Sequence, residues 1–202
     1  MTGMGKVTAS SSMSLDGCIA KDDNTIGRLF DWYFNGTVEI KTATDGLVFH
    51  LSPQSAEYWR ELVGSFGVLI CGRTLFDTTD GWGGIHTLDV PVVVLTHEVP
   101  TEWVERYPDA PFHFVTDGID AAVAKGQEIA GDKVVSVAAG TITRQCLEAG
   151  LLDEVVVDLV PVVMGKGRPY FGGMSLTDVP LGDPTLCIQG DRVTHLRFPV
   201  TK

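Results

Sequence analysis

Residues 134–171 constrain the fold more than any other part of the chain. They begin with a short apolar run, 134–137, that is typical of a buried strand, and Ala139-Gly140 follows within two positions. A helical pattern then ends at Gly150, and Glu154–Val160 predicts another buried strand. Because the first strand runs through small residues straight into a helix, the free N–H groups of that helix start lie outside the sheet, where they suit a phosphate.

Strands and helices alternate along the rest of the chain. We expect strands at 6–13, 67–71, 91–96 and 112–116, a helix after the capping residue Ser52, a helix capped by Asp117, and a C-terminal hairpin around Gly190-Asp191. Between the first strand and Ser52 lies a long, irregular segment. The sequence therefore predicts one α/β domain over residues 1–202. Its central sheet is mixed and mostly parallel, flanked by helices, and it carries a C-terminal antiparallel hairpin.

Net charge, apolar runs and cysteine spacing exclude several classes of function. The formal net charge of −11 argues against a nucleic-acid partner, which needs a basic surface, but leaves room for a small anionic ligand. No apolar run is long enough to span a membrane, and no signal peptide is apparent, so we expect a cytoplasmic protein. The scattered cysteines predict free thiols rather than a disulfide scaffold or a metal site: Cys18, Cys71, Cys146 and Cys187.

Four predicted strands end in small, hydroxylic or cationic residues, and parallel sheets bind ligands at that edge. The residues are Gly72, Arg73 and Thr74 after one strand, Thr96 and His97 after the next, Thr116 after a third, and Ala139, Gly140, Thr141 and Ile142 after the fourth. Each alone is more typical of a turn than of a contact. Together they indicate a dinucleotide cradle, although the chain contains neither a G-x-G-x-x-G fingerprint nor a P-loop.

Three segments carry a resemblance to a known family. Residues 14–20, reading SLDGCIA, resemble the start of the dihydrofolate-reductase-like superfamily, and GRTLFD at 72–77 is similar to its G-R-x-T-x-E element. The ending that runs from Leu151-Leu152-Asp153-Glu154 through Pro161 to Phe171 is similar to that of the reductase domain of bacterial riboflavin biosynthesis and its stand-alone relatives. The resemblance spans nearly the whole chain in the right order, and it implies an NADPH-dependent, often dimeric reductase.

The resemblance also implies roles for individual residues. Ala20 would lie near the nicotinamide, Arg73 and Thr74 near the cofactor phosphates and ribose, and Ala139, Gly140, Thr141 and Ile142 near the pyrophosphate. Thr96, His97 and Thr116 would surround the adenosine half. The choice between NADPH and NADH stays open, because His97 could pair with a 2′-phosphate that the adjacent Glu98 would repel.

The chain departs from the family at two places. Many relatives have Gly-Gly where this chain has Ala139-Gly140, and dihydrofolate reductases proper have a cis peptide at that pair; we predict a cis bond here too. Those enzymes also place a carboxylate early on the first helix, where this chain reads Ser52-Pro53-Gln54 and Glu57 follows a turn later. The second departure weakens dihydrofolate itself as the substrate.

Reduction of a C=N or C=O group also needs a proton. Asp16, at the end of the first strand, is the candidate for relaying that proton or binding substrate; the alternative is a turn aspartate that bonds its own backbone. Lys166 and Arg168 would either meet a substrate phosphate or be solvated loop charges.

Two functions remain open at this point. One is NADPH-dependent reduction of a pteridine-like or ribosylaminopyrimidine-like heterocycle. The other is binding of a nucleotide or flavin without turnover. We also expect a homodimer, because the aromatic cluster from Phe30 to Phe34 is hard to bury in a monomer of this size. The interface would involve that loop or the loop at 164–171.

Overall fold

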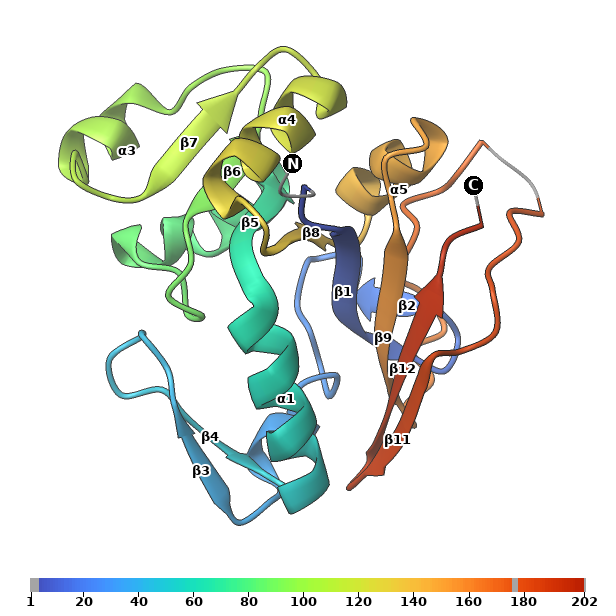
Figure 1. Cartoon of the computed structure of the whole chain (residues 1–202). Helices are drawn as coiled ribbons and strands as arrows, with labels where there is room; N and C mark the ends of the chain where they lie inside the picture. The colour runs from blue at the N-terminus through green and yellow to red at the C-terminus, as the bar shows by residue number, and fades with distance from the viewer. Residues whose placement is uncertain (1–3, 176–177, 202) are drawn as a thin grey trace.

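A computed structural model describes residues 4–175 and 178–201 (Figure 1). One eight-stranded sheet organises the chain, in the order β11-β12-β9-β1-β8-β5-β6-β7. Its strands are β1 (Val7–Ser14), β5 (Phe66–Gly72), β6 (Val92–Leu95), β7 (Phe112–Val115), β8 (Val134–Ala138), β9 (Glu154–Val160), β11 (Leu186–Gly190) and β12 (Val193–Pro199). The pairs from β9 to β7 are parallel, and β12 and β11 add antiparallel pairing at one end. The predicted fold class is confirmed.

Helices cover both faces of this sheet. On one face, α4 (Ile119–Ala130) and α5 (Thr141–Glu148) pack on buried residues such as Val7, Val68 and Val135. On the other face, α1 (Pro53–Ser65), α2 (Arg73–Thr78) and α3 (Thr101–Arg106) cover a second core. Because the side chains of a strand point alternately to the two faces of the sheet, β1 contributes residues to both faces, and every second residue of β1 faces α1.

The segment between β1 and α1 is more ordered than the sequence indicates. It contains β2 (Cys18–Ala20), the short 3₁₀ helix η1 (Asp31–Phe34) and a hairpin of β3 (Val38–Lys41) and β4 (Val48–Leu51). Trp32 and Phe49 are buried here in a third core, and the rings of Trp32 and Tyr33 stack at 3.9 Å. Of the aromatic cluster, Trp32 is buried and Tyr33 is half-buried, but Phe30 and Phe34 are 37% and 54% exposed, so the homodimer stays a prediction.

One local prediction is wrong, one short helix was not expected, and the turn of the confirmed hairpin is shifted by one residue. Asp117 does not cap α4, because Gly118 occupies the cap position with φ of 91° and no side chain bonds the helix start. The short helix α3 was not expected; its Trp103 is buried against α2, and that tertiary contact leaves only a weak local signal. The hairpin turn consists of Asp191 and Arg192, one residue later than predicted. In contrast, Ser52 caps α1 as predicted, by accepting from the Ser55 backbone N–H.

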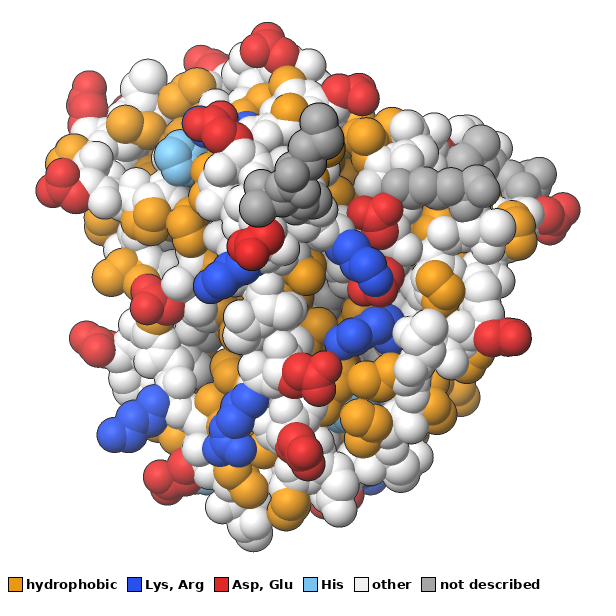
Figure 2. All heavy atoms as spheres, viewed as in Figure 1, with side chains coloured by type: hydrophobic (Ala, Val, Ile, Leu, Met, Phe, Trp, Pro, Cys, Tyr) orange, Lys and Arg blue, Asp and Glu red, His pale blue; other side chains and the backbone are white. Residues whose placement is uncertain are grey.

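In the described part of the chain, no helix is long and apolar enough to cross a membrane. The four cysteines are free thiols, with Cys187 exposed and the others buried. Acidic side chains are spread over the visible face rather than gathered in one patch (Figure 2). The excess negative charge is therefore not concentrated there into a single binding surface.

A left-handed turn follows α2. Residues 80–84 all have positive φ, including Trp82 at 50°, a conformation that a bulky residue rarely adopts. Trp82 packs edge-on against His86, with the ring centres 4.5 Å apart. His86 is 7% exposed, and this burial lowers its pKa to about 4.

His86 predicts an acid-sensitive stability. The unfolded chain takes up the imidazole proton near pH 6.5, whereas the folded protein resists protonation until about pH 4. Stability should therefore fall as pH drops through this window, by about 2 kcal/mol between pH 7 and pH 5 from this residue. Urea unfolding at several pH values measures it: His86→Gln should lose that slope and the surface control His97→Gln should keep it. Equal slopes in both variants would contradict the assignment.

Candidate functional site

The carboxyl ends of β5 and β8 lie close together. Gly72 ends β5, and a Cβ added there would stand 3.4 Å from the Ile142 side chain in the first turn of α5. Gly72 thus lets the start of α5 approach the neighbouring strand end. The structure therefore joins two of the predicted strand-end groups at one edge of the sheet.

Arg73 connects this pair to the end of β6. Its guanidinium donates to the Glu98 carbonyl at 3.1 Å and lies 3.5 Å from Thr96 Oγ1. Its Nε also forms an ion pair with Asp77, with the two atoms 2.6 Å apart. Arg73 is therefore held in place and partly neutralised, while its side chain is still 41% exposed. A phosphate bound there would compete with Asp77 for part of the guanidinium.

The other residues predicted to contact the ribose and adenosine of the cofactor differ in exposure. Thr96 is buried and bonds within its own turn, through the Glu98 carbonyl at 2.9 Å. Thr74, His97 and Thr116 are exposed at the ends of their strands, with no contact that ties them to Arg73. The structure thus gathers Gly72, Arg73 and Thr96, and it leaves the other three at the rim.

The helix start at Gly140 has the geometry that an anion needs. Gly140 has φ of 96°, which glycine adopts without strain and alanine does not. The first-turn N–H groups of α5, from Thr141 onward, have no carbonyl partner within the helix. A Cβ on Gly140 would stand 3.5 Å from the Ile19 side chain, so β2 with Ala20 lies beside this start.

The predicted cis bond between Ala139 and Gly140 is wrong. No cis peptide occurs among the described residues. The chain instead turns from β8 into α5 by the positive φ of Gly140, so Ala139 needs no unusual conformation. Ala139 is half-buried and packs at the edge of the core on the α5 side.

Residues 170–172 cover this helix start, a contact that the sequence analysis did not predict. The Gly140 N–H donates to the Tyr170 carbonyl at 2.7 Å. Gly172 follows, and a Cβ on it would lie 2.7 Å from the carbonyl carbon of Gly140 and from the Thr141 nitrogen. Only glycine fits so close to that peptide. The Gly172-Gly173 pair was the signal available in the sequence.

The Asp16 carboxylate is hydrogen-bonded to the loop at residues 164 and 165. Its carboxylate accepts from Ser14 Oγ at 2.6 Å, from the Met164 N–H at 3.1 Å and from the Gly165 N–H at 2.7 Å. The Ser14 hydroxyl and these backbone donors lower the pKa of Asp16 to about 2. Such a carboxylate stays ionised at neutral pH and has no proton to give. This geometry favours the turn interpretation of Asp16.

Two paired residues of central strands are only half-buried. They are Ser10 of β1 and Ala138 of β8. Paired residues of neighbouring strands point to the same face, and Ser10 alternates with residues that point away from α1. The face of the sheet toward α1 is therefore partly exposed at these two residues.

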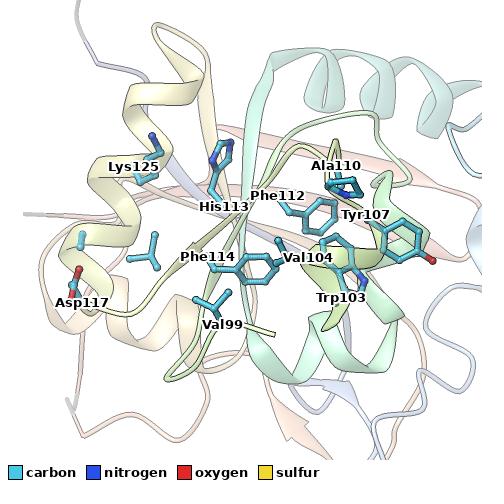
Figure 3. Close-up of a pocket in the computed structure, with 13 residues that line it drawn as sticks. Val99, Trp103, Val104, Tyr107, Ala110, Phe112, His113, Phe114, Asp117 and Lys125 are labelled. Carbon is cyan, nitrogen blue, oxygen red and sulfur yellow. The ribbon is translucent and has the colours of Figure 1, made fainter. Parts of the chain in front are cut away.

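Two pockets flank the outer strand ends. The larger, about 590 Å³, runs along the free edge of β7, with aromatic side chains of α3 and β7 on one side and Lys125 of α4 on the other (Figure 3). A second pocket, about 390 Å³, is lined by Arg73, Asp77 and Glu98. We place the candidate site at the strand ends rather than in the larger pocket, because the α5 helix start lies three strands away from β7.

Comparison with known proteins identifies a matching family and a curated relative. The family described as the RibD C-terminal domain matches residues 5–186. A curated relative, an uncharacterized protein named YwjB from Bacillus subtilis, is 23% identical over 162 residues, which cover 79% of each chain.

Solved structures share the fold at low sequence identity. A putative riboflavin biosynthesis protein from Shewanella sp. PV-4 has a TM-score of 0.68 at 20% identity, with 98% of this chain and 100% of that chain covered. A pyrimidine reductase-like protein from Corynebacterium diphtheriae has a TM-score of 0.62 at 13% identity, with 98% and 92% covered. A diaminohydroxyphosphoribosylaminopyrimidine deaminase/5-amino-6-(5-phosphoribosylamino)uracil reductase from Thermotoga maritima has a TM-score of 0.63 at 14% identity. This chain covers 57% of that longer protein, and 98% of this chain is aligned.

The glycine cover over α5 predicts a sharp contrast between two neighbouring substitutions. Gly172 and Gly173 both have positive φ, so alanine strains the backbone at either position, but only at 172 would its Cβ meet the Gly140–Thr141 peptide. Gly172→Ala should therefore cost about 1–3 kcal/mol more than Gly173→Ala, as overpacking does. Thermal or urea unfolding measures the difference. Equal losses would show that the cover does not press on the helix start.

Proposed function

This chain belongs to the RibD C-terminal domain family, and we propose that it reduces a small heterocycle with NADPH. The observation that carries the proposal is the strand-end cradle, in which Gly72, Arg73 and Thr96 adjoin the Gly140 helix start. The substrate class is a pteridine-like or ribosylaminopyrimidine-like ring. The name of the Thermotoga relative supports this class, since it includes a 5-amino-6-(5-phosphoribosylamino)uracil reductase.

The cradle fits a dinucleotide in chemistry and position. The pyrophosphate would meet the N–H groups from Thr141 and Ile142, where the helix dipole favours negative charge. Arg73 and Thr74 would contact phosphate and ribose, and Thr96, His97 and Thr116 would surround the adenosine. Ala20, beside Ile19 and Gly140, would adjoin the nicotinamide, which supplies the hydride when bound.

The chain's own residues would orient the substrate and exclude water. A flat ring would lie on the face of the sheet at the half-buried Ser10 and Ala138. Asp16 would act as a positioning residue, because it fixes the backbone of residues 164 and 165 at the end of β1. β10 (Arg168–Pro169) pairs with β2 and sets Arg168 opposite Ala20. The Arg168 side chain is exposed there, so its charge would meet a substrate phosphate.

A second candidate is binding of a nucleotide or flavin without turnover. The observation in its favour is the cover over α5: the Gly140 N–H is already taken by Tyr170, and Gly172 lies on the next peptide. Such a cover reduces the room left for a pyrophosphate. Turnover of a pterin or of the riboflavin precursor would remove this alternative.

Substitution of Arg73 tests the proposed binding of NADPH. Titrating the protein with NADPH and following nicotinamide fluorescence should show binding in the micromolar range or tighter. Arg73→Gln should weaken it about 10- to 100-fold, the effect of losing a hydrogen bond from a charged group. Arg28→Gln is the matched control, because Arg28 is also an exposed arginine paired with an aspartate, Asp31, and it does not line the pocket at Arg73.

Two outcomes would contradict the cofactor proposal. One is wild-type protein that binds neither NADPH nor NADH at high micromolar concentration. The other is equal weakening by Arg73→Gln and Arg28→Gln, which would indicate a general charge effect.

We further propose a homodimer in the cytoplasm. Large apolar side chains remain exposed at Leu15 (63%), Val163 (69%) and Phe34 (54%), and Leu15 and Val163 adjoin through the hydrogen bond from the Leu15 N–H to the Val162 carbonyl. Free cysteines, including the exposed Cys187, suit a reducing compartment.

Light scattering tests the dimer. The wild-type protein should elute at twice the mass of one chain, because burying these side chains against a second copy removes them from water. Val163→Asp should give the monomer, whereas Val99→Asp, an exposed apolar residue elsewhere, should leave the mass unchanged. Monomer mass for the wild type would refute the dimer.

A further inference from the structure

A charged pocket lies beside the strand end that the proposed site assigns to the adenosine and its ribose. It has a volume of about 390 Å³ and lies between Arg73 of α2 and residues of α3. Its lining includes six charged residues, namely the cations Arg73 and Arg106 and the acids Asp77, Asp80, Glu98 and Glu102. Two positive charges against four negative charges give this lining a net charge of −2. A ligand that enters the pocket therefore meets an excess of negative charge.

Both arginines of this pocket are already paired with an aspartate. Arg73 Nε lies 2.6 Å from Asp77 Oδ1, one helical turn further along α2. Arg106 Nη1 lies 3.3 Å from Asp80 Oδ2. The four side chains are 41–63% exposed, so an incoming anion can reach both pairs and compete for the arginines. The positive charge in the pocket is therefore offset before any ligand binds.

The two glutamates supply the excess negative charge. Glu98 and Glu102 are exposed, and neither forms an ion pair within residues 4–175 and 178–201. The backbone of Glu98 is held next to the guanidinium, because Arg73 Nη1 donates to the Glu98 carbonyl at 3.1 Å. The Glu98 N–H also donates to Thr96 Oγ1, at 3.3 Å. The Glu98 side chain therefore extends from a fixed point beside Arg73.

The two nicotinamide cofactors differ only at the 2′ position of the adenosine ribose. NADPH carries a phosphate monoester there, with a charge of about −1.5 to −2 at neutral pH, and NADH carries a hydroxyl group. A phosphate in this pocket would gain hydrogen bonds from Arg73 and would be repelled by the carboxylates. A hydroxyl group would gain no ion pair and meet no repulsion, and it can donate to a carboxylate oxygen. The acidic lining therefore reduces the advantage of the phosphate.

We propose that the acidic residues of this pocket make the protein bind NADH about as tightly as NADPH. Asp77 is the specificity-determining residue, because its carboxylate competes with a 2′-phosphate for the same guanidinium. Glu98 adds to this effect through its charge beside Arg73. The inference rests on the reductase function proposed above, and it extends the cofactor from NADPH to both nicotinamides.

Attraction by Arg73 and repulsion by the carboxylates act on the 2′-phosphate at the same time. A hydrogen bond from a charged group is worth about 10- to 100-fold in affinity, and the carboxylates offset most of that gain. Arg73→Gln removes the attraction and leaves the repulsion. It should therefore weaken the binding of NADPH by the factor predicted above and the binding of NADH by less.

Nicotinamide fluorescence titrations with NADPH and with NADH measure the two dissociation constants directly. For the wild-type protein the two constants should agree within about 10-fold. Asp77→Asn keeps the size of the side chain and removes its charge, so NADPH should bind about 10-fold more tightly while NADH changes less than about 3-fold. Glu98→Gln should shift the ratio of the constants in the same direction by a smaller factor, because the Glu98 carboxylate is not paired with the guanidinium.

Asp31→Asn is the matched control for Asp77→Asn. Asp31 is also an exposed aspartate paired with an arginine, Arg28 at 2.8 Å, and it does not line the pocket at Arg73. This control should leave the ratio of the two dissociation constants unchanged. Because the Asp77 side chain is 54% exposed, both variants should melt close to the wild-type temperature, and thermal unfolding checks that they are folded.

Salt dependence gives a second measurement, which needs no substitution. Added salt screens charges, and its effect on the parts that NADPH and NADH share cancels in the ratio of their dissociation constants. With an acidic pocket, this ratio should stay level or shift toward NADPH between about 50 mM and about 500 mM salt. A ratio that shifts strongly toward NADH would show that the pocket attracts the 2′-phosphate overall, and it would overturn the proposal.

The two proposals fail in different ways. Wild-type protein that binds neither dinucleotide would overturn the reductase function and this inference with it. Similar binding of both dinucleotides, without reduction of dihydrofolate, an oxidised pterin or 5-amino-6-(5-phosphoribosylamino)uracil, would overturn the reductase function and leave the cofactor preference in place. Wild-type turnover with NADPH bound more than about 10-fold more tightly than NADH, or an unchanged ratio in Asp77→Asn, would overturn the cofactor preference alone.

Discussion

Parallel pairing of β1 on both of its edges is the constraint on which the rest of the structure depends. Val7 pairs with Val135 of β8, and Thr8 pairs with Glu154 of β9, so β1 lies between two strands that come late in the chain. Because these pairs are parallel, the carboxyl ends of β1, β8 and β9 reach the same edge of the sheet. That edge is where β2, the α5 start and the loop fixed by Asp16 come together. Without the double pairing of β1, none of these elements would be neighbours.

The two faces of β1 then have different chemistry. Val7 and Ala9 face the apolar core under α4 and α5, whereas Thr8, Ser10 and Ser12 face α1. A buried carboxylate such as Asp158 is costly unless it is paired, and here the His195 imidazole and the Tyr58 hydroxyl both bond it. Polar residues are thus tolerated on this face because their hydrogen bonds are made between α1, β9 and β12.

Local patterns in the sequence were sufficient for the sheet and for part of the site. Short valine-rich runs predicted the parallel strands, since a strand buried on both faces has little alternation, and the residues at their ends indicated where a ligand would meet the sheet. The cover by Tyr170 and Gly172 was missed although the Gly172-Gly173 pair is a signal for it, because the contact depends on a loop that returns to α5 from a strand later in the chain. The buried hydrogen bonds that connect Ser55, His195 and Asp158 were missed for a related reason. These residues are up to 140 positions apart, and a single serine, aspartate or histidine within a strand or helix gives no signal until the fold brings them together.

The position of β1 in the sheet also has a consequence for how the protein is made. During synthesis the first strand leaves the ribosome long before β8 and β9, its only partners in the main sheet, exist. Contacts of such high sequence separation form slowly, and an unpaired apolar strand is prone to aggregation while it waits. The serines at 10–12 dilute the apolar character of β1 during that interval. The same residues that make one face of the finished strand polar therefore also keep the nascent chain soluble until its partners arrive.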